Sequence, residues 1–442
     1  MKKDITQANL ERFRTALKGG RKVNAVVARA VQQNGGVNAA SENIAAKQDL
    51  TRVFSIELPT GKVTNQKKSG RCWLFSTLNT LRHQFAEQYQ IKDFQFSQNY
   101  NSFYDRLEKA NHFYEEVLAT AAQPLASRIV QHLFAGPDDD GGQWANAAAL
   151  IEKYGVVPQD VMPETYNSEK TAEISDVLSL KLRKDGLKLR ELVNAQAAQQ
   201  EIVAAKEQFL EEVYRMLVYA FGEPPTVFDF EYRDDEHKYH LDQALTPQRF
   251  FAKYVAWDFN DYVCLTNAPD HELGQVYSLP SQDYIFNGQK IAFVNTELAV
   301  LKEAAIAQLK AGQSVWFGND VTKDLERTQG ILAPAFHERS ALFDVGLQLT
   351  KAQRLQTGEA HVSHAMTLVG VDVIAGGHPT KWKVENSWGG EKIGDQGYFV
   401  MSAQWFDDYV YEVIVNQKYL KDAQRRLLQQ KKIELAPWDS LA

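Results

Sequence analysis

The sequence predicts an α+β protein in which a helical part comes first, a strand-rich part comes last, and further helices are inserted between them. A helix is expected after residue 72, where apolar residues recur at helical spacing: Leu74, Leu78, Leu81 and Phe85. Two buried strands are expected at 364–371 and 381–389, joined by a glycine-containing turn at 375–377. The segment 178–219 is rich in Ala, Glu, Lys, Leu and Gln, which predicts long helices.

Cys72 stands at the expected N-terminal end of the first of these helices. Gln66 lies six residues upstream, a Ser-Gly turn precedes the thiol, and Trp73 follows it. Unpaired N–H groups and the positive end of the helix dipole favour negative charge here, so we expect a lowered pKa for the Cys72 thiol. The N–H of Cys72 and the amide of Gln66 are then candidate donors to the oxygen of a tetrahedral intermediate. The alternative is a buried structural cysteine, but the flanking residues favour a nucleophile.

His364 is the candidate base for this thiol. It begins the first expected strand, and Asn386 lies near the end of the second. An antiparallel hairpin would bring the two side chains side by side, so that the Asn386 amide holds one imidazole nitrogen while the other faces the thiol. A histidine that is merely part of the core is the alternative. His361 is a competing base, but it lies in a more polar approach, whereas the apolar run starts at His364.

These residues and their order resemble the papain-like cysteine peptidases, and within them the bleomycin hydrolase and aminopeptidase C family. The catalytic order of that clan is matched by Gln66, Cys72, His364 and Asn386, and its asparagine motif by residues 386–389. The narrower family is matched at 72–75, 140–144, 154–158, 162–168 and 437–439. The resemblance implies a papain-like two-lobe cysteine peptidase fold and catalytic roles for the four residues. It also implies that Trp73 and Trp388 shield the site.

Gly141 and Gly142 are candidate substrate-binding residues. In papain-like enzymes a Gly-Gly backbone lines the cleft and pairs with the main chain of a peptide substrate, which requires residues without side chains. The alternative is an ordinary acidic turn, because residues 137–142 are rich in turn-forming residues. The resemblance favours the cleft, and it makes peptides the expected substrates.

The C-terminal residues are expected to set the specificity. In aminopeptidase members of the resembled family the C-terminal arm lies in the cleft, and its carboxylate faces the free amino group of the substrate. This implies a thiol aminopeptidase in which Ala442 contacts the substrate. Only four residues follow Trp438, fewer than in the usual family form. An oligopeptide endopeptidase is therefore the alternative, and a non-catalytic oligomeric scaffold is a third hypothesis.

The chain is expected to divide into five segments. The inserted helices have no counterpart in a minimal papain, and the resembled family uses such an insertion to build ring-shaped hexamers, so we expect a homohexamer. The segments are an N-terminal arm, a helical lobe with the nucleophile helix, an inserted helical and connecting segment for oligomerisation, a β lobe with the histidine and asparagine, and a C-terminal helix with a cleft-directed tail: 1–60, 61–165, 166–290, 291–420 and 421–442.

Composition limits the cellular setting and the partners. The net charge of −7 argues against binding nucleic acid as the main function. No stretch resembles a signal peptide or a membrane span and only two cysteines occur, so we expect a cytoplasmic protein without membrane association. Cys264 lies in the apolar run 262–265 and is expected to be a buried strand residue. Neither metal-ligand spacing nor a phosphate-binding loop occurs, so no cofactor or metal is expected.

Overall fold

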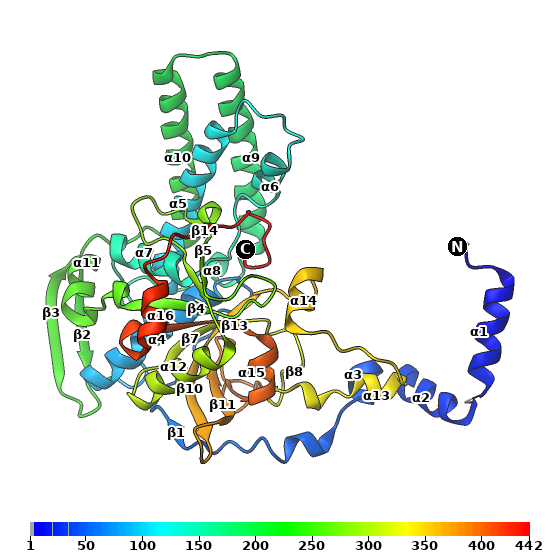
Figure 1. The fold of residues 1–442 in the computed structure, drawn as a ribbon. Helices are drawn as coiled ribbons and strands as arrows, with labels where there is room; N and C mark the ends of the chain where they lie inside the picture. Colours follow the sequence, from blue (N-terminus) through cyan, green and yellow to red (C-terminus); the bar gives the residue numbers. More distant parts are fainter. Residues whose placement is uncertain (1–3, 20, 34) are drawn as a thin grey trace.

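The computed structural model describes residues 4–19, 21–33 and 35–442, and it confirms the predicted α+β class. Among these residues, twelve strands form one sheet and two more form a separate hairpin. Figure 1 shows a body built around the sheet, from which two long helices project: α9 (Ala172–Asn194) and α10 (Gln199–Phe221). The first two helices extend away from the body as an arm: α1 (Gln7–Gly19) and α2 (Arg21–Gln33).

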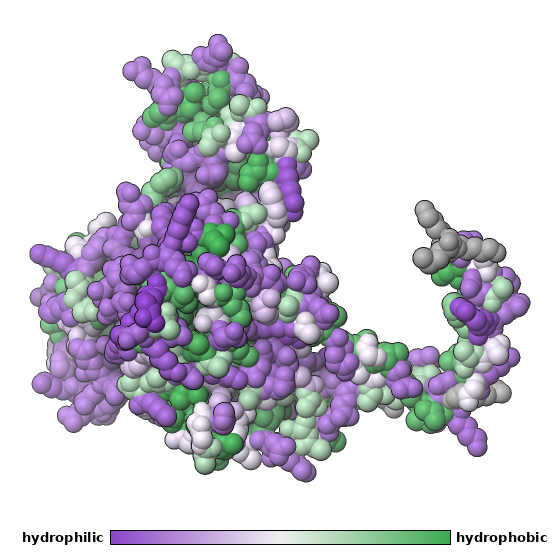
Figure 2. Space-filling view, viewed as in Figure 1, coloured by the Kyte–Doolittle hydropathy of each residue, from purple (hydrophilic) through white to green (hydrophobic). Residues whose placement is uncertain are grey.

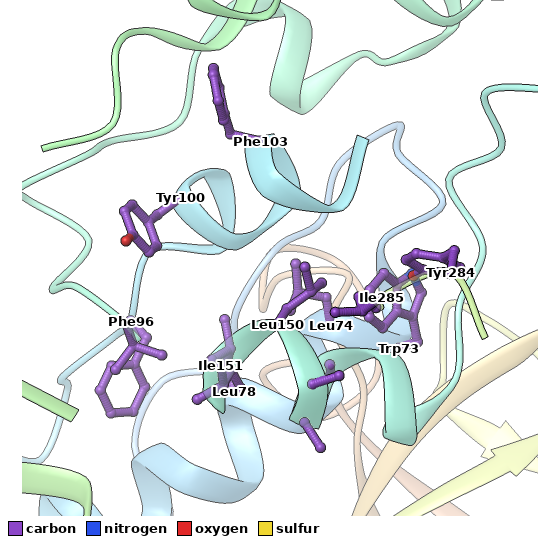
Figure 3. Close-up of a cluster of buried hydrophobic side chains, with 14 of the residues drawn as sticks. Trp73, Leu74, Leu78, Phe96, Tyr100, Phe103, Leu150, Ile151, Tyr284 and Ile285 are labelled. Atoms are coloured by element: carbon purple, nitrogen blue, oxygen red, sulfur yellow. The ribbon is translucent and has the colours of Figure 1, made fainter. Parts of the chain in front are cut away.

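The helical part of the body carries Cys72. Its helices are α4 (Cys72–Tyr89), α5 (Gln98–Ala119), α6 (Arg128–Ala135), α7 (Trp144–Tyr154) and α8 (Tyr166–Glu169). The helix predicted after residue 72 is confirmed, because Leu74, Leu78 and Leu81 are fully buried. Figure 3 shows the first two of these leucines beside Leu150 and Ile151 of α7. Cys72 therefore begins a helix of the core and not a surface helix.

The inserted segment forms α9 and α10, which confirms the long helices predicted from its composition. Both helices pack against α5 through buried side chains: Leu178, Leu182 and Leu189 of α9, and Val213 and Leu217 of α10. A hairpin and a short helix follow this pair: β2 (Phe228–Arg233), β3 (Tyr239–Leu245) and α11 (Pro247–Phe250).

The large sheet has the strand order β14-β5-β6-β4-β13-β7-β10-β11-β12-β9-β8, with β1 paired to β10. Its strands are β1 (Ile56–Glu57), β4 (Tyr262–Thr266), β5 (Gln275–Ser278), β6 (Phe293–Asn295), β7 (Val315–Asn319), β8 (Leu325–Glu326), β9 (Ile331–Leu332), β10 (His364–Val373), β11 (Pro379–Glu385), β12 (Tyr398–Ser402), β13 (Val410–Asn416) and β14 (Ile433–Glu434). The two predicted strands are confirmed as β10 and β11, which pair antiparallel across a turn at 374–378.

The two faces of this sheet belong to different cores. Trp316 and Ala365 point into the core that contains α4, whereas Phe317 and Met366 point into the core that contains α12 (Leu298–Lys310) and α15 (Ala403–Tyr409). This alternation follows from the two-residue period of a strand. The remaining α-helices are α3 (Gly36–Ala40), α13 (Arg339–Phe343), α14 (Lys351–Thr357) and α16 (Asp422–Leu427). Cys72 at the start of α4 and Ala365 at the start of β10 lie in the same core, so the two elements meet at these ends.

Cys264 differs from its prediction. It lies in β4 as expected, but its side chain is only half-buried, because it lines a cavity of about 290 Å³. Its sulfur lies 3.6 Å from Thr266 Oγ1 on the same strand.

In the described part of the chain no helix combines the length and the apolar character that crossing a membrane requires.

Candidate active site

A cavity of about 670 Å³ opens at the N-terminal end of α4. Its described wall brings together most of the residues that the sequence singled out: Cys72, Trp73, Gly141, Gly142, His364 and Ala442. Gln66, Asn386 and Trp388 are not part of that described wall. Asn386 and Trp388 contact His364, which is, and Gln66 contacts Ser69, the neighbour of the lining residue Gly70. The thiol and the imidazole, which are far apart in the sequence, therefore face one space.

His364 and Asn386 lie side by side, as the hairpin predicted. His364 Nε2 lies 2.9 Å from Asn386 Oδ1. The same Oδ1 accepts the N–H of Ser387 at 2.8 Å, and because a backbone nitrogen can only donate, the atom that faces the imidazole is the amide oxygen. Nε2 of a neutral His364 therefore carries the proton, and Nδ1 is left with a lone pair. This geometry is what a base for Cys72 needs.

Burial dominates the electrostatics of the pair. It raises the pKa of the Cys72 thiol to about 11, although the N–H groups of Ala365 and Trp73 act in the opposite direction. Burial also lowers the pKa of His364 to about 4. The expected lowering of the thiol pKa by the helix terminus is therefore wrong for this structure, since loss of hydration at a side chain only 9% exposed outweighs it. With these pKa values both groups are neutral near pH 7, and transfer of one proton from the thiol to the imidazole charges both at once.

Trp388 covers the contact between His364 and Asn386. Its ring centroid lies 5.2 Å from that of His364, and the Arg327 guanidinium lies 4.5 Å above the Trp388 ring. Asn386 is fully buried. A hydrogen bond kept from water in this way is stronger than an exposed one. The shielding role of Trp388 stays a prediction.

His361 lies on the cavity wall but lacks comparable support. Its side chain is exposed, and the hydrogen bond at this position is made by its backbone N–H to Asp320 Oδ2 at 3.3 Å. His364, in contrast, is buried and held by an amide. The geometry therefore favours His364 over His361.

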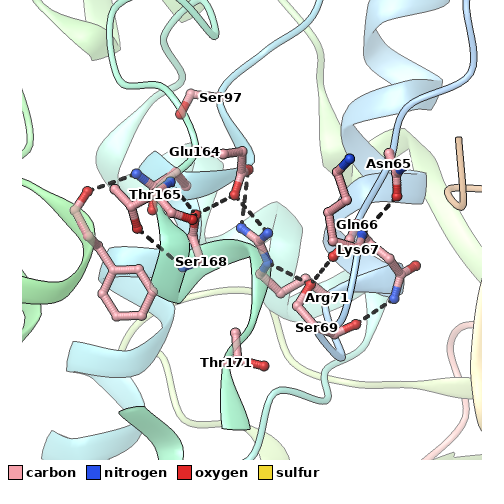
Figure 4. A network of polar contacts seen from close by, with 12 residues as sticks. Asn65, Gln66, Lys67, Ser69, Arg71, Ser97, Glu164, Thr165, Ser168 and Thr171 are labelled. Atoms are coloured by element: carbon pink, nitrogen blue, oxygen red, sulfur yellow. Dashed lines mark hydrogen bonds and ion pairs between the residues drawn. The ribbon is translucent and has the colours of Figure 1, made fainter. Parts of the chain in front are cut away.

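The amide of Gln66 has a fixed orientation. Its Nε2 donates to the carbonyl of Ser69 at 2.6 Å, and its Oε1 lies 2.6 Å from the Ser387 hydroxyl. Figure 4 shows the contact with Ser69, next to Arg71, whose guanidinium pairs with Glu164 at 2.8 Å. The turn before Cys72 is thus held on both sides, and Gln66 retains one N–H that the Ser69 carbonyl does not use.

Of the two glycines, Gly142 lies against the Trp73 ring, whereas Gly141 lies next to Asp139. A Cβ at Gly142 would come within 2.6 Å of the Trp73 ring, so only glycine fits this approach. The Gly141 carbonyl accepts a hydrogen bond from Lys109 Nζ at 2.6 Å. Both residues line the cavity beside Cys72. Their contact with substrate stays a prediction.

Asp140 ties this segment to the nucleophile turn, a role that the sequence did not reveal. Its Oδ2 accepts the N–H of Gly70 at 2.8 Å, its carbonyl accepts Trp73 Nε1 at 2.8 Å, and its carboxylate pairs with Arg106 and accepts the Thr171 hydroxyl. The signals in the sequence were the position of Asp140 before the glycine pair and its place in the matched motif 140–144. That position did not distinguish a structural carboxylate from an ordinary turn residue.

The C-terminal segment reaches the same cavity. Pro437, Trp438, Asp439 and Ala442 line it, and β14 joins the segment to the edge of the sheet by pairing parallel with β5. The Arg128 guanidinium lies 3.8 Å above the Trp438 ring. Leu441 is fully buried among side chains that include Tyr277 and Tyr411. The short tail is therefore firmly packed at the cavity.

Comparisons with known proteins agree with this geometry. The model of the Peptidase C1-like family matches residues 4–442. Aminopeptidase G of Lactobacillus delbrueckii subsp. lactis is 51% identical and aminopeptidase C of Lactobacillus helveticus 44% identical; the matches cover 100% of this chain and 100% and 98% of the relatives. The crystal structure of PepW from Lactobacillus rhamnosis HN001 superimposes with a TM-score of 0.97 at 49% identity, covering 100% of this chain and 99% of that one. The chain therefore belongs to the Peptidase C1-like family, which confirms its resemblance to papain-like cysteine peptidases.

Proposed function

We propose that the protein is a cysteine aminopeptidase that removes N-terminal residues from peptides through an acyl-enzyme on Cys72. One observation carries the proposal: the thiol, the amide-held imidazole and the chain's own C-terminal segment share a single cavity. The names of the relatives, aminopeptidases G and C, support the same activity.

In the acylation step, Cys72 Sγ attacks the carbonyl carbon of the first peptide bond. The S–C bond forms while the thiol proton passes to Nδ1 of His364, whose Nε2–H stays hydrogen-bonded to Asn386 Oδ1. The attraction between the imidazolium and the negative charge that forms on the substrate oxygen offsets the low basicity that burial gives the imidazole. His364 then protonates the leaving amine as the C–N bond breaks. Water hydrolyses the thioester with His364 as the base, which restores the thiol.

The oxygen of the tetrahedral intermediate has two proposed donors. The N–H of Cys72 belongs to the first turn of α4, where backbone N–H groups have no acceptor within the helix. The second donor is the N–H of Gln66 that the Ser69 carbonyl leaves unused. Donors held in place before the reaction stabilise the oxyanion without a cost of reorganisation.

The cleft is proposed to bind the substrate by its main chain and its free amino group. Gly142 can pair with the peptide backbone because it carries no side chain between that backbone and the cavity. A chain that ends at Ala442 carries a carboxylate at the cavity wall, which pairs with the ammonium group of the substrate. The packed tail also occupies the space that residues before the first one would need. Aminopeptidase specificity follows from both effects.

We also propose that copies of the chain assemble in the cytoplasm, as a hexamer by family resemblance. None of the described residues of α1 is buried, although this helix carries exposed Leu10, Phe13 and Leu17. The projecting helices α9 and α10 expose Val177, Leu180 and Val203, and Figure 2 shows apolar patches on this projection and on the arm. Exposed apolar surface of this kind is typical of subunit contacts. Two free cysteines suit a reducing compartment.

Product analysis tests the function. One peptide is offered with a free and with an acetylated N-terminus, and the products are identified by mass spectrometry. We expect stepwise loss of N-terminal residues from the free peptide and little cleavage of the acetylated one. Intact mass measurement of the enzyme first verifies that its chain ends at Ala442. Equal internal cleavage of both peptides would contradict the aminopeptidase and favour the oligopeptide endopeptidase.

A further inference from the structure

His271 contacts the tail from outside the cavity. His271 is not among the described residues of the cavity wall, whereas Asp439 is. His271 Nε2 lies 3.2 Å from the Asp439 carboxylate. Its Nδ1 lies 3.0 Å from Asp270 Oδ1, as an ion-pair contact without the alignment of a hydrogen bond. Each nitrogen of one imidazole thus faces a different carboxylate, an arrangement that suits the imidazolium form.

Asp439 in turn shapes the last residues of the chain. Its Oδ1 accepts the N–H of Leu441 at 3.1 Å, and its carbonyl accepts the N–H of Ala442 at 3.0 Å. Ser440 adds a second link to the same place, because its hydroxyl donates to Asp270 Oδ2 at 2.7 Å. Asp439 therefore helps to position Ala442, together with Ser440 and the buried Leu441.

The turn that carries His271 is itself rigid. The fully buried side chain of Asn295 accepts the N–H of Ala268 at 2.9 Å and donates to the Ala268 carbonyl at 3.0 Å. The N–H of His271 closes the turn by donating to the same carbonyl at 3.0 Å. The Tyr277 ring of β5 packs against the imidazole, with centroids 5.1 Å apart. Because its turn is fixed in this way, His271 can hold the tail in one position.

We propose that His271 is a positioning residue for specificity: as an imidazolium between Asp270 and Asp439, it holds residues 439–442 in the cavity and thereby confines cleavage to peptides with a free N-terminus. This inference rests on the proposed aminopeptidase function. It assigns no chemical step to His271, which acts on the substrate only through the tail.

The contact of His271 with the tail should depend on pH. The charged and titratable groups around His271 are Asp270 and Glu272 on its own turn, Asp439 on the tail and Tyr277 on β5. Asp270 first, and then Asp439, raise the pKa of His271 above its ordinary value against the effect of burial. A group with a raised pKa holds its partners fully below its ordinary pKa and loses them as the pH rises through the raised one. A neutral imidazole has one N–H for two carboxylates, so the tail loosens on the alkaline side.

The test compares His271→Phe with wild type on one peptide in its free and acetylated forms. We expect KM for the free peptide to rise about tenfold, the worth of one charge-assisted contact, with kcat changed less than about twofold. Cleavage of the acetylated peptide should rise. Asp439→Asn should behave alike, and the double variant should be no worse than either single one, because both remove the same contact.

A pH series separates positioning from mere stability. Wild type should lose its preference for the free peptide as the pH rises past the pKa of His271, whereas His271→Lys, which keeps its charge, should retain it. Comparing the two enzymes at each pH cancels titration of the substrate amine. Unchanged KM and selectivity in a folded His271→Phe would overturn the inference, as would a fall in kcat alone. If that variant does not fold, the pH series decides. Failure of wild type to cleave any peptide would instead refute the aminopeptidase function.

Discussion

Two histidines of this protein lie in opposite electrostatic settings. His364 is buried with a neutral amide as its partner, and burial lowers its pKa to about 4. His271 lies between two carboxylates, of which Asp270 contributes most to raising its pKa. An imidazole that is neutral but can accept a proton suits catalysis, whereas one whose charged form is stabilised by two carboxylates suits an ion pair. The catalytic centre and the tail anchor therefore differ in kind, and substitutions should separate them.

The largest expected effect is at the thiol. Cys72→Ser should lower kcat by about 10⁴-fold or more, because a serine hydroxyl is a far weaker nucleophile and removal of one member of a catalytic set removes most of its effect. Cys264→Ser is the matched control and should keep activity. Circular dichroism should show the same fold in both variants. Substantial turnover by a folded Cys72→Ser would remove the acyl-enzyme from the mechanism.

The next effect concerns the imidazole and its partner. His364→Ala should be nearly as damaging as Cys72→Ser, while Asn386→Ala should cost about 100-fold, because it disturbs orientation and leaves the base in place. His361→Ala is the control on the same cavity wall and should cost much less. Steady-state kinetics measures all three. An inactive His361→Ala beside an active His364→Ala would exchange the two histidines in the mechanism.

A smaller effect is expected at the oxyanion donor. Gln66→Ala should lower kcat by roughly 10–1000-fold through loss of one hydrogen bond made in the transition state. KM should change little, since the ground-state carbonyl depends less on this donor. A variant that raised KM alone would show that Gln66 binds substrate and does not stabilise the intermediate.

The smallest effect on activity is expected at Leu441 in the tail, which we compare with Leu78 in the catalytic region. Both leucines are fully buried. Leu78→Ala in α4 should lower the free energy of unfolding by about 2–5 kcal/mol, because it leaves a cavity in the core. Leu441→Ala should leave global unfolding almost unchanged and raise KM for free peptides by up to about tenfold, because it loosens only the tail. Denaturant unfolding and hydrogen exchange of residues 437–442 distinguish the two. Equal losses of global stability would show that the tail is part of the core.

The sequence predicted those features that depend on residue type, order and period. Leucine spacing located α4, the apolar runs located β10 and β11, and the chemistry of a thiol with a base pointed to Cys72, His364 and Asn386. The thiol pKa was predicted in the wrong direction because desolvation depends on how α4 packs against the sheet. The contacts of Asp140 and His271 could not be predicted because their partners come from distant segments of the chain, and such contacts leave no periodic signal in the sequence.

The pairing of β14 with β5 has a consequence for the lifetime of the protein in a crowded solution. β5 is otherwise the last strand on its side of the sheet, and three of its four residues are buried. Ile433, Glu434 and the N–H of Leu435 cover its backbone groups. A proteolytic cut before Ile433 would thus do more than open the cleft. It would expose β5 as an edge strand, and exposed edge strands pair with strands of other molecules, so chains cut at this point should aggregate before they act on longer peptides.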